Sequence, residues 1–192
     1  MQFLDLTVQG WLEELGEPGP APGGGSAAAI AAAMGAELVA MAARISADSW
    51  PEAGGTAAQA STLSIRLAAL AQADADVYAE SLRALAQPEE IPADLRDSEL
   101  GAALDRSAQT PLAIAETACD VALVALEARE RVDLKVQADV DAAIAFAGAA
   151  AQAAARLVEV NLSATRDDPR VQQARATAET AARAMRRVFP PT

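Results

Sequence analysis

The strongest chemical signal in the sequence is a run of three glycines between a proline and a serine. Gly23, Gly24 and Gly25 follow Pro22, and Ser26 opens an alanine-rich segment. Glycines let a backbone approach a ligand closely, and the start of a helix offers unpaired N–H groups with partial positive charge. The segment therefore predicts either a ligand-binding loop for an anionic group or, as the plain alternative, a flexible entry into a helix. It is not a P-loop, because Gly-Lys-Ser/Thr is missing, and no strand precedes it as a dinucleotide site requires.

Asp74 carries the second signal, because it falls on the apolar stripe of its segment. Leu67 and Leu70 precede it by seven and four residues and Tyr78 follows it by four, which puts all of them on one helical face. A carboxylate on such a face must be paired or must take part in chemistry. Burial would raise its pKa and suit it to proton transfer near neutral pH. The structural alternative is a carboxylate bonded to Arg66 or to a neighbouring helix.

A second aspartate, Asp139, lies near the apolar side of another segment, in the first turn of a predicted helix. An aspartate at that position commonly serves as a partner of the helix dipole. Lys135, four residues earlier, is its candidate partner in an ion pair. Taken alone, the position of Asp139 predicts a structural role.

The residue types that the sequence lacks narrow the chemistry further. It contains no histidine, which removes Ser-His-Asp and Cys-His catalysis and nearly every ordinary zinc site. We therefore expect no metal, and proton transfer falls to carboxylates. Lys135 and Tyr78 are the single lysine and the single tyrosine of the chain.

Charge and cysteine usage indicate the compartment and the excluded partners. The net charge is −12 and the isoelectric point is near 4.4, so binding to nucleic acid is not expected. Cys119 is the single cysteine and cannot form an intramolecular disulfide, which fits a reducing cytoplasm. The longest uncharged stretch, residues 18–36, opens with prolines and glycines and is not expected to span a membrane. The first fifteen residues lack the basic flank of a signal peptide.

These groups must be positioned by helices, because apolar residues recur at helical spacing and no convincing period-2 run interrupts them. The pattern predicts an all-α bundle of about six helices, two or three of them long. The predicted spans are approximately 8–15, 26–49, 56–86, 98–129, 136–162 and 169–188. Thr7 and Ser26 are predicted to cap two of these helices, and Pro111 is expected to kink or break the fourth.

The composition indicates how such a bundle packs. Hydrophobic residues make up 52% of the chain and aromatic residues only 3%, so the apolar surface is mostly alanine, leucine and valine. Alanine buries little area, so alanine-rich helices gain stability from close and long contacts, often with a second copy of the chain. We expect one domain over residues 1–192 and a homodimer.

At the glycine segment the residues also suggest a family. Pro-Ala-Pro-Gly-Gly-Gly-Ser before an alanine-rich helix, from Pro20 to Ala29, resembles the signature of the cyclodeaminase/cyclohydrolase family, found alone in bacteria and fused to formiminotransferase in animals. Four further stretches follow in the family's order: residues 74–78, 111–117, 138–140 and 158–162. The resemblance covers nearly the whole chain.

The resemblance implies an all-helical, dimeric subunit that binds folate in a cleft containing the glycine segment. Its implied reactions are deamination of 5-formimino-tetrahydrofolate to 5,10-methenyl-tetrahydrofolate, and hydrolysis of the methenyl compound to 10-formyl-tetrahydrofolate. Neither needs a metal or redox cofactor. The resemblance implies that Asp74 transfers the proton and that Asp139 assists it. The implied substrate-binding residues are Pro22, Gly23, Gly24, Gly25, Ser26, Tyr78, Asp133 and Asn161.

The sequence also departs from the family at three dipeptides. It has Val132-Asp133 where relatives tend to carry Gly-Asn, Ala138-Asp139 in place of Ser-Asp, and Leu157-Val158 in place of Asn-Val. A site that loses hydrogen-bonding groups should bind a pterin more weakly, by about 1–3 kcal/mol for each buried group left unpaired. Two alternatives to an active enzyme follow: a non-catalytic dimer that binds folate or a small anion, and a purely structural helical dimer.

Overall fold

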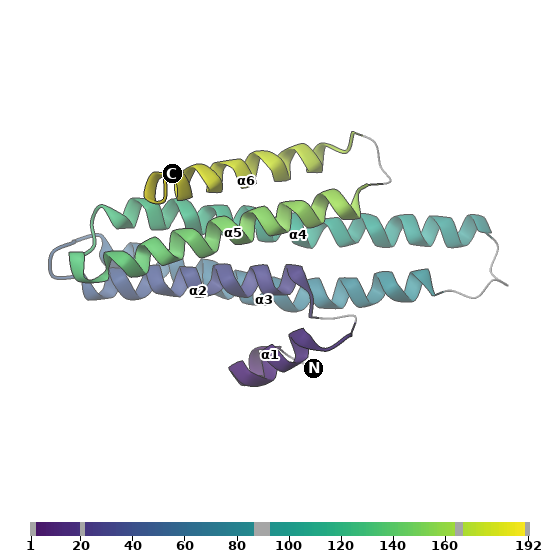
Figure 1. The fold of residues 1–192 in the computed structure, drawn as a ribbon, viewed down its shortest axis with the longest axis horizontal. Helices are drawn as coiled ribbons and strands as arrows, with labels where there is room; N and C mark the ends of the chain where they lie inside the picture. Colours follow the sequence, from purple (N-terminus) through teal and green to yellow (C-terminus); the bar gives the residue numbers. More distant parts are fainter. Residues whose placement is uncertain (1–2, 20–21, 87–92, 164–166, 191–192) are drawn as a thin grey trace.

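The protein folds as a bundle of long helices whose directions alternate along the chain (Figure 1). The computed structural model describes residues 3–19, 22–86, 93–163 and 167–190, and every regular element in these ranges is helical, which confirms the predicted fold class. The elements are η1 (Phe3–Asp5), α1 (Val8–Gly16), α2 (Gly24–Ile45), α3 (Ala53–Leu85), α4 (Ala93–Arg129), η2 (Leu134–Val136), α5 (Gln137–Asn161) and α6 (Pro169–Val188). Residues 20 and 21 of the glycine segment and residues 87–92 lie outside the described ranges.

Two helix starts match the capping chemistry in the sequence. The hydroxyl of Thr7 accepts a hydrogen bond from the N–H of Gly10 at 3.0 Å and caps α1. Asp168 caps α6 in the same way by accepting from the N–H of Arg170 at 2.9 Å, with Pro169 in the first turn.

The predicted cap at Ser26 is wrong, because α2 starts two residues earlier, with Gly23 as its N-cap. α3 starts at Ala53 rather than Thr56, so Gly54 and Gly55 lie in its first turn. Glycines are tolerated there because the first N–H groups of a helix have no intrahelical partner. α4 also starts earlier than the predicted Ser98.

Pro111 does not break α4, which runs without interruption from Ala93 to Arg129. Proline has no N–H, so the carbonyl four residues before it, that of Ser107, loses its usual intrahelical donor. The side chain of Asn161 in α5 replaces that donor: its Nδ2 lies 2.8 Å from the Ser107 oxygen. A contact between distant helices therefore compensates for the proline.

The interior is built mainly of alanine. Leu67, Ile114 and Ile144 are the largest fully buried side chains among the described residues, and most other buried apolar positions are alanine. Small side chains let the helices approach closely. Where α2 packs on α5, a methyl group added at Gly35 would lie 3.0 Å from the carbonyl oxygen of Ala143.

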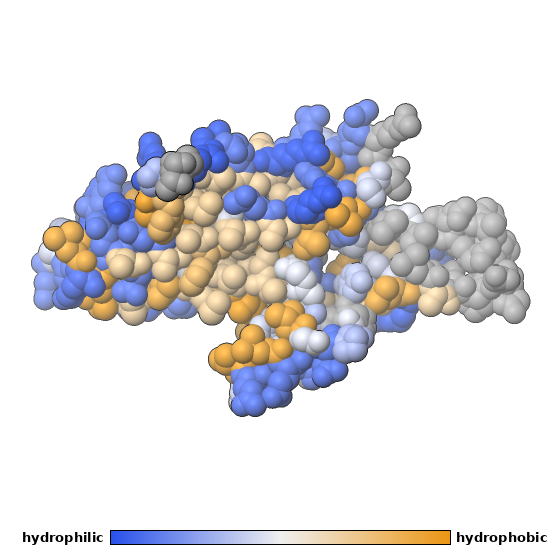
Figure 2. Space-filling model, in the orientation of Figure 1, coloured by the Kyte–Doolittle hydropathy of each residue, from blue (hydrophilic) through white to orange (hydrophobic). Residues whose placement is uncertain are grey.

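Helix α1 lies to one side of the bundle and contributes no buried residue (Figure 1). The segment before it is held at Phe3, whose N–H donates to the Gln72 side chain of α3 at 3.0 Å and whose ring meets Trp11 edge-on with the centroids 5.0 Å apart. Figure 2 shows a broad apolar face over α2 and α5 in the same view. Beside it is a groove of about 750 Å³, called the α2 groove below, lined by Leu4, Ile30, Ala33, Met34, Glu37, Leu38, Met41, Arg44, Ser64, Ala68 and Phe146.

Two segments, Gly24–Ile45 and Leu134–Asn161, are long and apolar enough to cross a membrane when only length and composition are considered. In their most apolar windows, 61% and 50% of the residues are buried inside the bundle. Core helices of ordinary bundles pass the same test.

Candidate functional site

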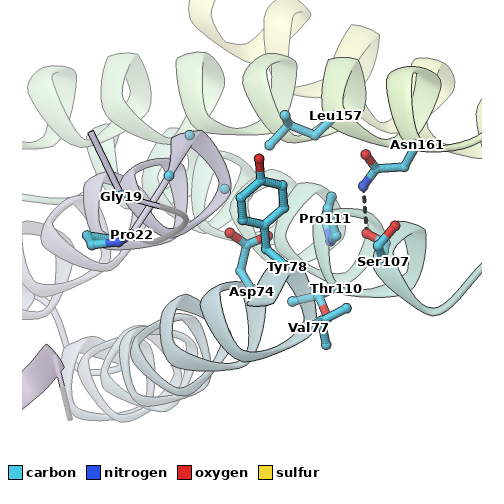
Figure 3. Close-up of a pocket in the computed structure, with 13 residues that line it drawn as sticks. Gly19, Pro22, Asp74, Val77, Tyr78, Ser107, Thr110, Pro111, Leu157 and Asn161 are labelled. Carbon is cyan, nitrogen blue, oxygen red and sulfur yellow. Dashed lines mark hydrogen bonds between the residues drawn. The ribbon is translucent and has the colours of Figure 1, made fainter. Parts of the chain in front are cut away.

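A cavity of about 280 Å³ opens where four helices of the bundle meet. The start of α2, the middle of α3, α4 around its proline and the end of α5 form its walls (Figure 3). Its lining residues are Gly19, Pro22, Gly23, Gly24, Gly25, Asp74, Val77, Tyr78, Ser107, Thr110, Pro111, Leu157 and Asn161. The glycine segment, Asp74, Tyr78 and Asn161, which lie far apart in the sequence, therefore surround one space.

Asp74 lies against the first turn of α2. A Cβ atom added at Gly25 would overlap the Asp74 carboxyl group, so only glycine at this position leaves room for the carboxyl. The backbone N–H of Ser26 donates to the same carboxyl. Asp74 thus provides the polar cap for α2 that Gly23 lacks, from a different helix. This is the structural role that the sequence left open, with Ser26 rather than Arg66 as the partner.

The hydroxyl of Ser26 is fully buried and faces two acceptors. Its Oγ lies 2.8 Å from the carbonyl oxygen of Ala71 and 3.2 Å from Oδ2 of Asp74. The hydroxyl has a single hydrogen to donate. When that hydrogen points to Ala71, the contact of 3.2 Å to Asp74 is satisfied by a protonated carboxyl that donates to Oγ. When Asp74 is ionised, the hydroxyl can turn and donate to it.

Burial raises the pKa of the Asp74 carboxyl above its ordinary value, and the hydrogen bonds from Ser26 partly offset this effect. Desolvation disfavours the charged form of a carboxylic acid. Asp74 is the only acidic side chain among the lining residues that the structure describes. The cavity therefore holds one carboxyl group whose environment favours keeping a proton to higher pH than usual, which suits a general acid or base.

The remaining walls are mixed in character. Tyr78 is half exposed at the cavity, while Val77, Pro111 and Leu157 give it apolar sides on which a flat ring can pack (Figure 3). Leu157, one of the departures from the family pattern, lines the cavity directly, whereas Val132 is buried among the apolar residues of another part of the core.

Sequence reasoning missed several of the lining residues: Gly19, Val77, Ser107, Thr110, Pro111 and Leu157. The signal available for this part of the wall was Pro111, since a proline inside a predicted helix marks a carbonyl that needs another partner.

Asp133 and Asp139 lie outside this cavity. Asp133 accepts from the Ser49 hydroxyl at 3.0 Å and pairs with Lys135 at 3.1 Å, and these bonds lower its pKa. Its backbone N–H donates to Ser46 at the end of α2, which is the opposite end from Gly25. The prediction that Lys135 pairs with Asp139 is therefore wrong, because Lys135 reaches Asp133 instead.

Asp139 sits in the first turn of α5, whereas Asn161 ends that helix at the cavity. Twenty-two residues of α-helix correspond to about 33 Å. One chain alone therefore does not bring Asp139 to Asp74. Within the described ranges, moreover, no group of three or more Cys, Asp or Glu side chains is arranged to hold a metal ion.

Comparison with known proteins agrees with this architecture. The sequence profile of the formiminotransferase-cyclodeaminase family matches residues 7–180. Mouse formimidoyltransferase-cyclodeaminase is 32% identical over 123 residues, which cover 60% of the chain but only 23% of that longer protein. A solved structure described as formiminotetrahydrofolate cyclodeaminase from Thermotoga maritima superposes with a TM-score of 0.82 at 20% identity, covering 96% of each chain.

The profile match extends from the cap of α1 to the middle of α6 and includes the glycine segment and all four helices that form the cavity. The chain belongs to the formiminotransferase-cyclodeaminase family.

Proposed function

We propose that the protein is a folate one-carbon enzyme, a formimino-tetrahydrofolate cyclodeaminase or a methenyl-tetrahydrofolate cyclohydrolase. The observation that carries the proposal is the environment of Asp74. Its carboxyl has a raised pKa and lies against Gly25 and Ser26 in a cavity with apolar walls. Both reactions pass through a tetrahedral carbon between two nitrogens, and both need one group to move protons at that carbon.

In deamination, N10 of the folate attacks the formimino carbon on N5 and forms the second C–N bond of the ring. The attacking nitrogen passes its proton to the formimino nitrogen, which becomes an amino group on the tetrahedral carbon, and this amino group must be protonated before it can leave as ammonia. A protonated Asp74 donates that proton, and its carboxylate then stabilises the cationic methenyl product. The two C–N bond changes are thereby accompanied by balanced proton transfers.

In hydrolysis, water adds to the methenyl carbon of the cation and gives up a proton. The Asp74 carboxylate accepts that proton and returns it to N5 as the bond between N5 and the carbon breaks. The remaining hydroxyl proton is released to solvent as the formyl C=O forms. The product carries the formyl group on N10. Because one carboxyl can act as the acid in deamination and as the base in hydrolysis, Asp74 suits either reaction.

The proposed site lies at a cleft of a homodimer. A cavity of about 280 Å³ is at the small end of ligand pockets, so it accommodates the reacting part of a folate and leaves the rest outside. Exposed apolar side chains that line the α2 groove, among them Met34 and Phe146, suit burial against a second copy. These features support a closed two-fold dimer through this face.

Such a dimer gives Asp139 a way to assist the reaction. Met34 lies near the middle of α2. The cavity lies at the start of this helix, and the contact between Asp133 and Ser46 lies at its end. A two-fold axis through the middle of α2 brings the start of one α2 beside the end of the other. The proposed helper is therefore Asp139 of the partner subunit, not that of the same chain.

We propose no metal or redox cofactor for this reaction, a cytoplasmic location, and no role for nucleic acid or a membrane. The second candidate is a non-catalytic dimer that binds folate or a small anion. The observation that favours it is Leu157, an apolar side chain on the cavity wall at a position where the family pattern has a polar one. In that case the cavity would retain affinity for a folate without turnover.

The experiment that separates the two candidates follows the absorbance of the methenyl chromophore. Purified protein mixed with 5,10-methenyl-tetrahydrofolate should speed its loss, or protein mixed with 5-formimino-tetrahydrofolate should speed its appearance. Asp74→Asn serves as the control. Equal rates with the unaltered protein, with Asp74→Asn and with buffer would reject the enzyme, and a thermal shift on adding 5-formyl-tetrahydrofolate would then support the binding protein.

A further inference from the structure

The Ser107 carbonyl is available to a side chain because of Pro111. In an α-helix with any residue other than proline at position 111, the N–H of that residue would bond to this carbonyl. Proline removes that donor within α4, and the Ser107 oxygen accepts instead from Asn161 Nδ2 at 2.8 Å. Pro111 is buried, and the Asn161 side chain supplies a donor in place of the N–H that proline lacks.

This bond determines which end of the Asn161 amide faces the cavity. A carbonyl oxygen can only accept, so the nitrogen of the amide must point at Ser107 and its oxygen must point away. In Figure 3 the Asn161 oxygen is turned to the side on which Leu157 and Tyr78 lie. Among the residues that the structure describes, none donates a hydrogen bond to this oxygen.

We propose that Asn161 is a specificity-determining residue: it presents a fixed hydrogen-bond acceptor that selects ligands with an N–H donor on the ring bound in the cavity. Pro111 is the positioning residue that keeps the amide in this orientation. An asparagine held in this way cannot rotate to donate to a ligand without giving up its bond to Ser107. A ligand with an acceptor at that place would set it against the Asn161 oxygen, with no hydrogen between the two acceptors, and would bind less well.

The inference rests on the proposed function for the identity of the ring. The pteridine of a reduced folate carries N–H donors at its 2-amino group, at N3 and at N8, and its flat face suits the apolar walls formed by Val77, Pro111 and Leu157. Asn161 then accepts from one of these groups while the reacting carbon faces Asp74.

The test measures binding of three probes: 5-formyl-tetrahydrofolate, its analogue without the 2-amino group and with a methyl group on N3, and its analogue with carbon at position 8. Asn161→Leu should weaken binding of 5-formyl-tetrahydrofolate by about 10- to 100-fold. For the analogue that lacks the relevant donor, the unaltered protein should already bind weakly, and Asn161→Leu should change nothing further. Equal loss for all three probes, or no loss for any, would overturn the proposal.

A matched control removes the same kind of bond elsewhere in α5. The Gln152 amide donates to the carbonyl of Gly148 at 3.2 Å outside the cavity, and Gln152→Leu should leave the affinity for all three probes unchanged. A loss with Gln152→Leu equal to that with Asn161→Leu would show a general effect on α5 and overturn the proposal.

The orientation itself is tested without any ligand. In Pro111→Ala, the new N–H bonds to Ser107 within α4 and competes with Asn161. The side-chain amide resonance of Asn161 should be protected from hydrogen exchange in the unaltered protein and should lose that protection in Pro111→Ala. Unchanged protection would overturn the positioning role of Pro111.

The two proposals can fail separately. If the unaltered protein binds 5-formyl-tetrahydrofolate but turns over neither folate substrate, the proposed reaction fails while the pattern across the three probes still decides the role of Asn161. If it binds none of the probes, both proposals are overturned.

Discussion

At the scale of single residues, the position of Asp74 depends on the missing side chain of Gly25. Gly25→Ala places a methyl group where the Asp74 carboxyl now lies, so the carboxyl must move away from Ser26 and from its place in the cavity. We expect turnover to fall by about 100-fold, because a displacement of a catalytic group by about 1 Å can cost that much. Steady-state kinetics on a purified variant measures the effect.

Gly54→Ala is the matched control, since Gly54 also lies in the first turn of a helix but outside the cavity, and a Cβ atom at that position meets nothing within 4 Å. It should retain most of the activity. Equal loss in the two variants would mean that any alanine in a glycine-containing first turn lowers activity, rather than the loss of room for Asp74.

A second prediction at this scale concerns the charge of Asp74. Burial raises its pKa in the folded chain, so the folded state keeps the proton at pH values where the unfolded state has lost it. Stability therefore falls as the pH rises from the ordinary value of 3.8 through the raised value, and the ionised carboxyl destabilises the fold at neutral pH. Asp74→Asn removes this charge and keeps a side chain that can cap α2.

Asp74→Asn should accordingly raise the free energy of unfolding at pH 7 by on the order of 1 kcal/mol, while turnover falls by about 10²- to 10⁴-fold. Thermal unfolding at a series of pH values measures the first effect, and the gain should vanish below pH 3.8, where both states are protonated. A variant that is less stable at neutral pH would show that the capping bonds outweigh desolvation.

At the scale of helices, the close approach of α2 and α5 depends on Gly35. Alanine normally stabilises a helix interior relative to glycine by up to about 1 kcal/mol. At Gly35, however, the added methyl group would press on the Ala143 backbone, which cannot move as a flexible side chain can. Overpacking of this kind typically costs about 1–3 kcal/mol.

Gly101→Ala makes the same change in α4 at an exposed position where a Cβ atom has open space. Chemical denaturation should therefore show Gly35→Ala to be less stable than Gly101→Ala by about 1–3 kcal/mol. If the two variants unfold at the same denaturant concentration, α2 and α5 can separate without cost and the contact is not tight.

The helices also show which features can be predicted from the sequence. Thr7, Asp168 and Pro169 act through their own neighbours in the chain, and the predicted starts of α1 and α6 are correct. The sequence predicts a kink or a break at Pro111, and α4 does not break there. The donor that replaces the missing N–H belongs to Asn161, which is 54 residues from Ser107 in the sequence. Local patterns cannot show such a partner.

The same limit applies to the cavity. The glycine segment and Asp74 can be found from the sequence, because three successive glycines and an acid on an apolar stripe are unusual on their own. Residues such as Val77, Thr110 and Leu157 have no distinctive sequence context and become part of a site only when α3, α4 and α5 converge. The separation of Asp139 from Asp74 also emerges only from the length and direction of α5.

At the scale of the whole molecule, the α2 groove predicts a change in assembly. Met34 is 52% exposed there, and Met34→Glu introduces a charge into a face that the proposed dimer buries. Sedimentation velocity at micromolar concentration should show the unaltered protein as a dimer and Met34→Glu as mainly a monomer. Turnover should fall with the loss of dimer, because the partner's Asp139 is then absent from the cleft.

Leu123→Glu provides the comparison. Leu123 is 44% exposed on α4 and does not line the groove, so the same change there should leave the dimer intact. A monomeric unaltered protein, or a dimer that persists in Met34→Glu, would contradict an interface through this groove.

The alanine interior has a consequence for how this protein can change over evolutionary time. Most buried positions already carry a single methyl group, and buried serines such as Ser46 and Ser81 satisfy their hydroxyls on carbonyls of their own helices. Alanine, serine, glycine and cysteine can therefore replace one another at many of these positions, while larger residues cannot enter. Descendant sequences are free to drift far apart in identity, yet the spacing between their helix axes is held almost constant by residue size alone.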